Sequence, residues 1–235
     1  MAFTGPDPAA ARRTTRLRLA TIVLGVVLVV WQGRARILTT IGEWLTADDP
    51  PTPVEVMVAS LASGRGDALE VARLYREHIS PRIVVARWQD ETFDAELRTL
   101  GVPWVPPHEL AVAILEKSGV PRSAIQLLDD RVDGLNTEIA AIAAFARTAR
   151  PASILYVTAR SHSRRARWLL GRMLPAETTL VVHASPRDDF RPDTWWHSRA
   201  RSRELAMEYL RWANSFGLRD LWGTPSPKSV PESAD

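Results

Sequence analysis

The pattern of apolar and polar residues changes near residue 54. Beyond it, short apolar segments rich in Val, Ile and Leu alternate with longer segments whose apolar residues recur every three or four positions. The short segments predict β-strands and the longer ones predict α-helices. The predicted strands are Glu55–Ser60, Arg82–Ala86, Ile125–Leu128, Ile154–Thr158 and Leu180–Ala184. The predicted helices are Ala68–His78, Glu109–Ser118, Thr137–Arg147, Arg164–Leu174 and Ser198–Phe216.

Helix start and stop signals support this division. Asp67 with Glu70 resembles a capping box, Pro107 suits a first helical position, and Gly119 suits a helix end. Asn136 stands where an N-cap is expected. Strands and helices that alternate in this way form a parallel sheet with helices on both faces. The sequence therefore predicts an α/β fold, a Rossmann-like three-layer sandwich with a mostly parallel, five-stranded sheet.

One interval is long for a strand-to-helix loop. About twenty residues separate Ala86 from Pro107, whereas such loops usually have about two to six. The interval contains Trp88 and Trp104, and one helical turn is predicted at Phe93–Leu100. Long loops at the carboxyl edge of a sheet are often lids or binding loops. Two interpretations stay open, a binding loop and an irregular insertion packed by its two tryptophans.

The N-terminal part carries a different signal. An apolar run, Leu19–Trp31, has arginines on both sides. The run is shorter than the roughly 20 residues that cross a bilayer, but flanking arginines reach toward lipid headgroups and a terminal tryptophan suits the interface. We therefore expect a transmembrane anchor over residues 17–38. The alternatives are a cleaved signal peptide, for which Gly33 and Ala35 make a poor cleavage site, and a buried core helix.

The arginines around the run predict its orientation. Arg12, Arg13, Arg16 and Arg18 precede the run, and Arg34 and Arg36 follow it. This bias favours a single-pass protein of the cytoplasmic (inner) membrane with its domain on the outer side. The predicted parts are a disordered basic N-terminus (1–16), the anchor (17–38), a juxtamembrane segment and linker (39–53), the α/β domain (54–223) and a flexible tail (224–235).

Composition limits the classes of function. The chain of 235 residues suffices for one sizeable α/β domain with an appendage. A net charge of +3 from scattered arginines, without a nucleic-acid-binding motif, argues against a nucleic-acid partner. Because the sequence has no cysteine, disulfides, a thiol nucleophile and cysteine-bound metals are excluded. Common nucleotide, hydrolase and zinc-protease motifs are also missing, and we assign no cofactor.

The strongest candidate site follows the predicted strand Ile154–Thr158. A polar loop carrying His162 leads into a helix that begins near Arg164 and Arg165. Ligands of parallel sheets bind at the carboxyl ends of strands, and a helix N-terminus there attracts anions. His162 suits proton transfer or a hydrogen bond to a phosphate, and Arg165 suits a bidentate contact with an anion. The alternatives are a histidine that caps the helix and a solvated basic helix face.

Other polar groups have two interpretations each. Glu109 either faces the same crevice or complements the dipole of its own helix. Asn136 is most simply an N-cap, which is compatible with a ligand contact. Asp129, Asp130 and Asp133 form an acidic cluster without matching ligands at a defined spacing. We expect this cluster to be a polar loop and predict no metal site.

Several segments match the pattern of one known family. VTARSHSRRA, Val157–Ala166, is similar to the signature V-T-S-x-x-H-x-x-R-A, and ARLYREHISPRIVV, Ala72–Val85, resembles L-Y-x-x-G-x-x-P-x-I-V-V. The order of membrane helix, linker and domain agrees as well. These features resemble the domain-of-unknown-function family that includes the SanA, ElyC and YdcF proteins. Further similar elements are Glu109 with Ala111, Gly119–Pro121, Asn136–Thr137, and Glu204 with Glu208.

The resemblance implies a membrane-anchored envelope protein with a Rossmann-like domain and a role in cell-envelope or peptidoglycan biogenesis. The convergence of His162, Arg165, Asn136 and Glu109 on one predicted edge of the sheet favours a ligand that carries phosphate, such as a nucleotide-like small molecule or a lipid precursor. The candidate site residues are His162 and Arg165 as catalytic groups, and Glu109, Asn136, Thr137, Thr158 and Asp67 as ligand-binding groups.

The chain departs from the family pattern at two turns. Ala59, Ser60 and Leu61 stand where the family has glycines after its first strand, and Ala86 and Arg87 replace a Ser-Gly pair after the second. Glycines at such turns let backbone N–H groups approach a phosphate closely. Without these glycines, we expect less room for a phosphate beside the backbone N–H groups of the two turns.

Two functions remain open from the sequence. If the domain is an enzyme, we expect phosphoester or phosphoryl chemistry, with Arg165 stabilising charge and His162 moving a proton. The alternative is a non-catalytic envelope scaffold or regulator with a decayed ligand site. The missing glycines favour this alternative.

Overall fold

A parallel sheet forms the centre of the domain. The computed structural model describes residues 8–62, 64, 66–89 and 93–215. Within them, five strands lie in the order β3-β2-β1-β4-β5 and all neighbouring strands are parallel, which confirms the predicted α/β fold and strand number. The strands are β1 (Val56–Ala59), β2 (Ile83–Trp88), β3 (Ile125–Val132), β4 (Ser153–Thr158) and β5 (Thr179–Ala184).

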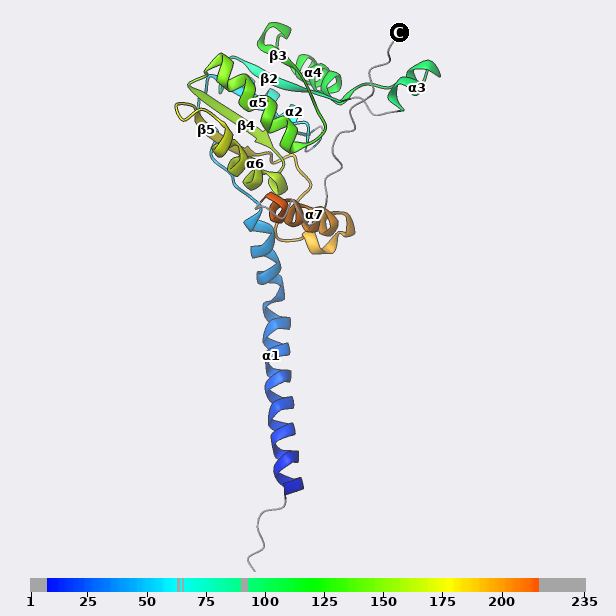
Figure 1. Ribbon diagram of the computed structural model, residues 1–235, viewed down its shortest axis with the longest axis vertical. Coiled ribbons are helices and arrows are strands. Elements are labelled where there is room, and N and C mark those ends of the chain that lie inside the picture. Colours follow the sequence, from blue (N-terminus) through cyan, green and yellow to red (C-terminus); the bar gives the residue numbers. More distant parts are fainter. Residues whose placement is uncertain (1–7, 63, 65, 90–92, 216–235) are drawn as a thin grey trace, which may run out of the picture.

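Helices cover both faces of this sheet and make the domain three layers thick (Figure 1). Helices α2 and α4 pack on one face, and α5 and α6 pack on the other. Each buries its apolar side against the strands, as the periodicity of the sequence requires. The bounds are α2 (Gly66–Arg76), α4 (Pro107–Lys117), α5 (Leu135–Ala149) and α6 (Arg160–Met173).

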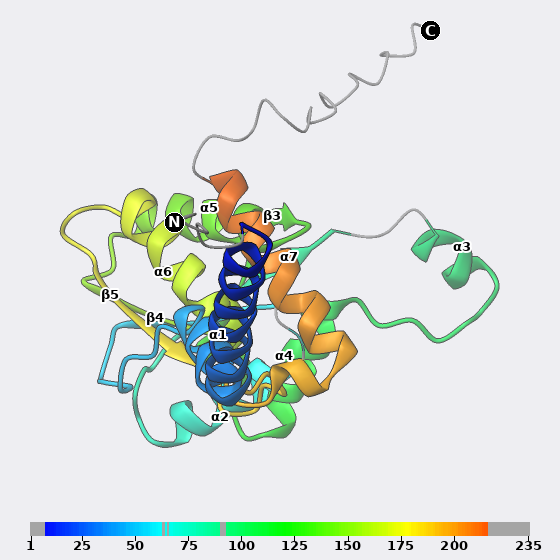
Figure 2. The same ribbon diagram turned by 90° about the horizontal axis from the view of Figure 1, so that it is seen from below.

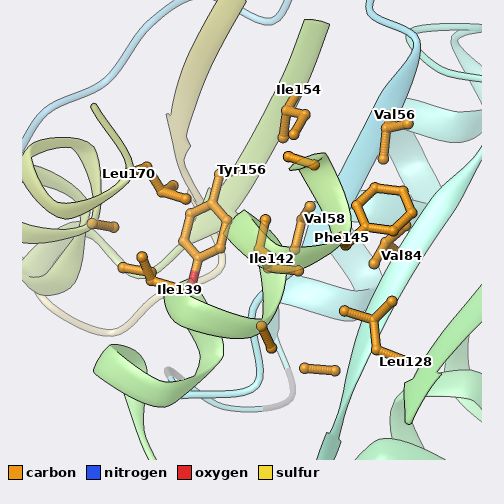
Figure 3. Close-up of a cluster of buried hydrophobic side chains, with 14 of the residues drawn as sticks. Val56, Val58, Val84, Leu128, Ile139, Ile142, Phe145, Ile154, Tyr156 and Leu170 are labelled. Carbon is orange, nitrogen blue, oxygen red and sulfur yellow. The ribbon is translucent and has the colours of Figure 1, made fainter. Parts of the chain in front are cut away.

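The strands are buried on both faces, because successive side chains of a strand point to opposite sides. In β1, Val56 and Val58 contact the cluster under α5 and α6, and Met57 and Ala59 contact the cluster under α2 and α4. Figure 3 shows the first cluster, with the ring of Tyr156 between the sheet and α5. Full burial of each large apolar side chain stabilises the fold by about 1.5–3 kcal/mol.

The strand order reverses between β1 and β4. From β1 the chain moves outward through β2 to β3, and then crosses to β4 and β5 on the other side. Ala59 pairs with Val157, so β1 and β4 end next to each other. Where the order reverses in this way, the two following connections leave toward opposite faces and a crevice opens at the carboxyl ends of the strands.

Three elements bear on the predicted boundaries. α6 begins at Arg160, so His162 lies in the first turn of a helix and the predicted loop position is wrong. β3 continues to Val132, so Asp129 and Asp130 lie in a strand, and the expectation of a polar loop is wrong there. The helical turn predicted in the long interval is confirmed as α3 (Asp94–Thr99).

The N-terminal helix α1 (Pro8–Trp44) projects from the domain (Figures 1 and 2). Residues 8–16 are helical, where the sequence predicts disorder, and residues 1–7 and 216–235 lie outside the described residues. Among the described residues, no single helix meets both the length and the hydropathy of a membrane span. A pair of segments bent by 40°, Thr21–Leu28 and Val30–Trp44, meets them together.

The end of α1 is fastened to the domain by the last helix. A separate apolar cluster joins Leu45, which follows α1, to Phe190 and to two residues of α7 (Arg199–Ser215), Leu205 and Trp212. The 3₁₀ turn η2 (Trp195–His197) precedes α7 and packs against the same cluster through Trp195.

The linker after α1 is held along β5. Asp49 exchanges two hydrogen bonds with the backbone of Val182, at 2.8 and 3.0 Å. His183 lies between the carboxylates of Asp48 and Glu70, at 2.9 and 3.2 Å. Although burial opposes both shifts, these hydrogen bonds and charges raise the pKa of His183 above its ordinary value and lower the pKa of Glu70 to about 2.

Candidate functional site

A polar cleft of about 420 Å³ opens at the carboxyl edge of the sheet. Its walls come from the turn after β1, the end of β2, the start of α5, the start of α6 and the last turns of α7. This is the position that the reversal of strand order predicts for a ligand site. The lining residues include Ala62, Trp88, Gly134, Asn136, Thr137, His162, Arg165 and Arg211.

A buried ion pair forms the floor of the cleft. Arg165 of α6 is 3% exposed and donates through two nitrogens to both carboxylate oxygens of Glu208 in α7, which is fully buried. A third nitrogen of Arg165 donates to the Asn136 side-chain oxygen at 2.7 Å. Bidentate pairing of this kind fixes the guanidinium plane. Arg165 therefore joins α5, α6 and α7, and Glu208 already neutralises its charge.

His162 lies one helical turn before this pair. Its Nε2 is 3.7 Å from a carboxylate oxygen of Glu208. Burial lowers the pKa of His162 below its ordinary value of 6.5, and the attraction of Glu208 offsets this only in part. The imidazole is consequently neutral near pH 7 and has both a proton donor and a proton acceptor.

Arg211 supplies the accessible positive charge of the cleft. Its side chain is 49% exposed, and its Nη1 is 3.3 Å from Glu208. The two guanidinium groups of Arg165 and Arg211 face one carboxylate, so this group of three carries one net positive charge. Solvent exposure leaves Arg211 able to turn toward an anion in the cleft.

The start of α5 contributes backbone donors. The first N–H groups of any α-helix have no acceptor within the helix, and the dipole makes this end positive. Gly134, Asn136 and Thr137 line the cleft. The Thr137 hydroxyl is bound within the turn, where it accepts from the N–H groups of Asp133 and Gly134 at 3.1 Å. Thr137 thus shapes this helix end from within.

A buried carboxylate fills the turn after β1. Glu138, fully buried in the first turn of α5, accepts hydrogen bonds from the Leu61 N–H and the Ser60 hydroxyl, each at 2.8 Å, and from the Tyr156 hydroxyl at 3.0 Å. Burial raises the pKa of Glu138, against the effect of these donors. The Leu61 N–H that a phosphate would meet at this turn is therefore already bonded to an acid of the chain itself.

Two further cavities flank the cleft and share Trp88 with it. An apolar one of about 260 Å³ lies between Leu61 and the segment that contains Trp104 and Val105. A polar one of about 340 Å³ includes Arg87, Arg98, His108 and Glu109. Trp88 is the wall that separates these spaces.

The predicted site residues fall into two groups. His162, Arg165, Asn136 and Thr137 meet in the cleft. Glu109 is exposed and lies in the neighbouring polar cavity. Asp67 and Thr158 are buried and do not line the cleft. Among the described residues, no group of three or more His, Asp or Glu side chains is arranged to hold a metal ion.

Comparison with protein-family models, with curated proteins and with solved structures finds no match to this chain.

Four residues of the site were not predicted from the sequence as site residues. Glu208 and Arg211 belong to α7, and only the fold brings that helix to α6. Glu138 lies in the first turn of the predicted helix Thr137–Arg147. Trp88 was predicted in the interval after the strand Arg82–Ala86, and β2 continues to it. A polar residue in the first turn of the helix that follows a strand is the sequence signal that points to Glu138.

Proposed function

We propose that this chain is a membrane-anchored envelope protein whose Rossmann-like domain binds a phosphate-bearing ligand in the cleft. The observation that carries the proposal is the joint presence of Arg211, a neutral His162 and the N-terminus of α5 around one cavity. Anions bind favourably at helix N-termini and beside guanidinium groups. Membership of the SanA, ElyC and YdcF family is part of the same proposal.

The anchor is supported by the surface of α1. The large apolar side chains described between Leu19 and Trp31, among them Val26, are 52–65% exposed. A soluble protein rarely leaves so continuous an apolar surface in water. Insertion of α1 into the inner membrane removes this surface from water, and the arginine bias puts the domain on the outer side.

We propose ligand contacts by different groups from those expected from the sequence. Arg165 is held by Glu208 and acts as the support of the cleft floor. Arg211 and the N–H groups of α5 are the groups left for a phosphate. His162 is placed to donate a hydrogen bond to a phosphate oxygen or to accept a proton, so any catalysis in this cleft is phosphoester or phosphoryl chemistry.

A second function, that of a non-catalytic scaffold or regulator, has its own support. Glu138 occupies the turn after β1, and Glu208 occupies the main bonding directions of Arg165. These donors, the Leu61 N–H and the Arg165 guanidinium, are groups that an anionic ligand would otherwise bind. The two carboxylates of the chain accept their hydrogen bonds instead, so no ligand is needed there. Absence of phosphate binding is the result that favours this function.

The test is a calorimetric titration of the detergent-solubilised full chain with inorganic pyrophosphate and with a nucleoside diphosphate. We expect saturable binding that Arg211→Gln weakens by about tenfold or more, because hydrogen bonds to charged groups contribute about 1.5–3 kcal/mol. The matched control is Arg147→Gln, an exposed arginine near the other end of α5. Equal binding by both variants, or none by the wild type, rules out the proposed ligand site.

A further inference from the structure

One face of α7 stays uncovered. Its exposed residues recur every three or four positions, as expected for one side of a helix. Met207 and Leu210 on this face are 43% and 60% exposed. The opposite side carries the buried residues Leu205, Glu208 and Trp212. The exposed residues of α7 are Arg199, Ala200, Arg203, Ala206, Met207, Leu210, Arg211 and Asn214.

The position of α7 relative to α1 is fixed by several contacts. The indole N–H of Trp195 donates to the Leu38 carbonyl at 2.9 Å, and the Tyr209 hydroxyl donates to the Ile41 carbonyl at 2.8 Å. Trp44 stacks on Tyr209 with ring centres 5.3 Å apart. Figure 1 shows α7 lying across the end of α1, at the end of the domain from which α1 projects.

These contacts place α7 and the turn before it beside the last turns of α1, from Leu38 to Trp44. The predicted span of residues 17–38 ends at the first of these contacts, so α7 lies next to the predicted end of the membrane span.

The residues at this level suit a lipid surface. Trp195 and Trp196 of η2 are half-buried side chains of the type that gathers at membrane interfaces. Exposed positive charges outnumber exposed negative ones around them and on the adjoining turns of α1 and α7. The exposed charged residues there are Arg34, Arg36, Arg199 and Arg203, against Glu43 and Asp193.

We propose that the exposed face of α7, with Trp195 and Trp196, lies on the surface of the same membrane that α1 crosses and contacts anionic lipid headgroups. This inference rests on the proposed anchoring of α1. Met207 and Leu210 enter the headgroup region, and Arg199 and Arg203 meet lipid phosphates, which is the arrangement of an interfacial amphipathic helix. Because Arg211 belongs to α7 and lines the cleft, the cleft opens beside the bilayer surface.

The chain has no cysteine, so single cysteines give clean labelling sites. The full chain is reconstituted into vesicles of phosphatidylcholine with phosphatidylglycerol, with a nitroxide at Leu210→Cys, Val26→Cys or Leu100→Cys. Leu100 is 69% exposed, close to the 60% of Leu210, and follows α3 at the far end of the domain (Figure 1). Relaxation by oxygen, which concentrates in lipid, is compared with relaxation by a water-soluble nickel chelate.

We expect the ratio of oxygen to nickel relaxation to be several-fold higher at position 210 than at position 100, and highest at position 26. Arg199→Glu with Arg203→Glu should reduce the ratio at position 210. A lipid-like ratio at 26 with equal ratios at 210 and 100 overturns the surface contact and leaves the anchor standing. A water-like ratio at 26 overturns both. Spin–spin broadening at position 210 without lipid exposure assigns the face to a second copy of the chain and also overturns the proposal.

Discussion

Removal of Glu208 tests whether its buried ion pair with Arg165 stabilises the fold. Glu208 is fully buried and Arg165 is 3% exposed. Glu208→Ala leaves a buried guanidinium with Asn136 as its remaining side-chain partner in the cleft floor. Breaking a buried pair by removal of one partner costs about 3–5 kcal/mol. Since a domain has about 5–15 kcal/mol of stability, this is a large fraction of the total.

The assay is equilibrium urea denaturation of the detergent-solubilised full chain, followed by tryptophan fluorescence. Replacing both partners with apolar residues removes the unpaired charge, so Arg165→Met with Glu208→Leu should be less destabilised than Glu208→Ala alone. The exposed acid Glu96 provides the control variant Glu96→Ala, whose free energy of unfolding should stay near that of the wild type. Two results would refute the pairing. One is a loss of unfolding free energy below about 1 kcal/mol in Glu208→Ala, and the other is a loss in the double variant that equals the sum of the losses in Arg165→Met and Glu208→Leu alone.

Two further predictions concern stability. The pKa of His183 is raised, so its contribution to the free energy of unfolding is full below pH 6.5 and is lost as the pH rises through its folded-state pKa. Burial lowers the pKa of His162, so the contribution of its neutral form is full above pH 6.5 and is lost as the pH falls. Urea midpoints against pH should therefore lose their alkaline decline in His183→Gln and their acid decline in His162→Gln; the same change in both variants would contradict the assignment. A Cβ at Gly42 would lie 2.8 Å from the Pro192 carbonyl oxygen, so Gly42→Ala should cost about 1–3 kcal/mol, while Gly33→Ala, with open space around it, should not destabilise.

The sheet and its helices could be predicted because their signals are local. Runs such as Ile154–Thr158 are mostly apolar, and strands of this kind are buried on both faces of a parallel sheet. The same strand end pointed to His162 and Arg165, which line the cleft together with Asn136. These residues lie close in space because carboxyl ends of neighbouring parallel strands share one edge. The prediction of Asn136 as an N-cap was wrong, because α5 begins at Leu135 and its N-cap is Gly134.

The errors arose where distant residues decide the structure. α6 begins at Arg160 without a side-chain cap from Ala159, because the carboxylate of Asp188 accepts the Arg160 N–H at 2.9 Å. No pattern near residue 160 reveals that partner. β3 continues through Asp129 because it is an edge strand that pairs with β2 alone, and edge strands tolerate exposed charges.

The partner of Arg165 was hidden for a similar reason. The sequence showed a basic helix start that suits an anion, and it could not show that Glu208, on a helix far along the chain, takes that role. The same holds for Glu138, whose place at the turn after β1 depends on how α5 packs against the sheet. Both acids change the expected chemistry, because they leave Arg211 and backbone donors as the groups open to a ligand.

The imidazole of His162 lines the cleft and reports directly on phosphate binding there. The full chain has five histidines, so selective isotope labelling of histidine gives few signals, which His162→Gln and His78→Gln assign. On titration with inorganic pyrophosphate we predict a saturable shift of the His162 signal and a rise in its pKa, because a bound anion favours the imidazolium form. The exposed His78, at the other edge of the sheet, should not respond. A His162 signal that stays unchanged in position and pKa, or that moves only in parallel with His78, would contradict phosphate binding in the cleft.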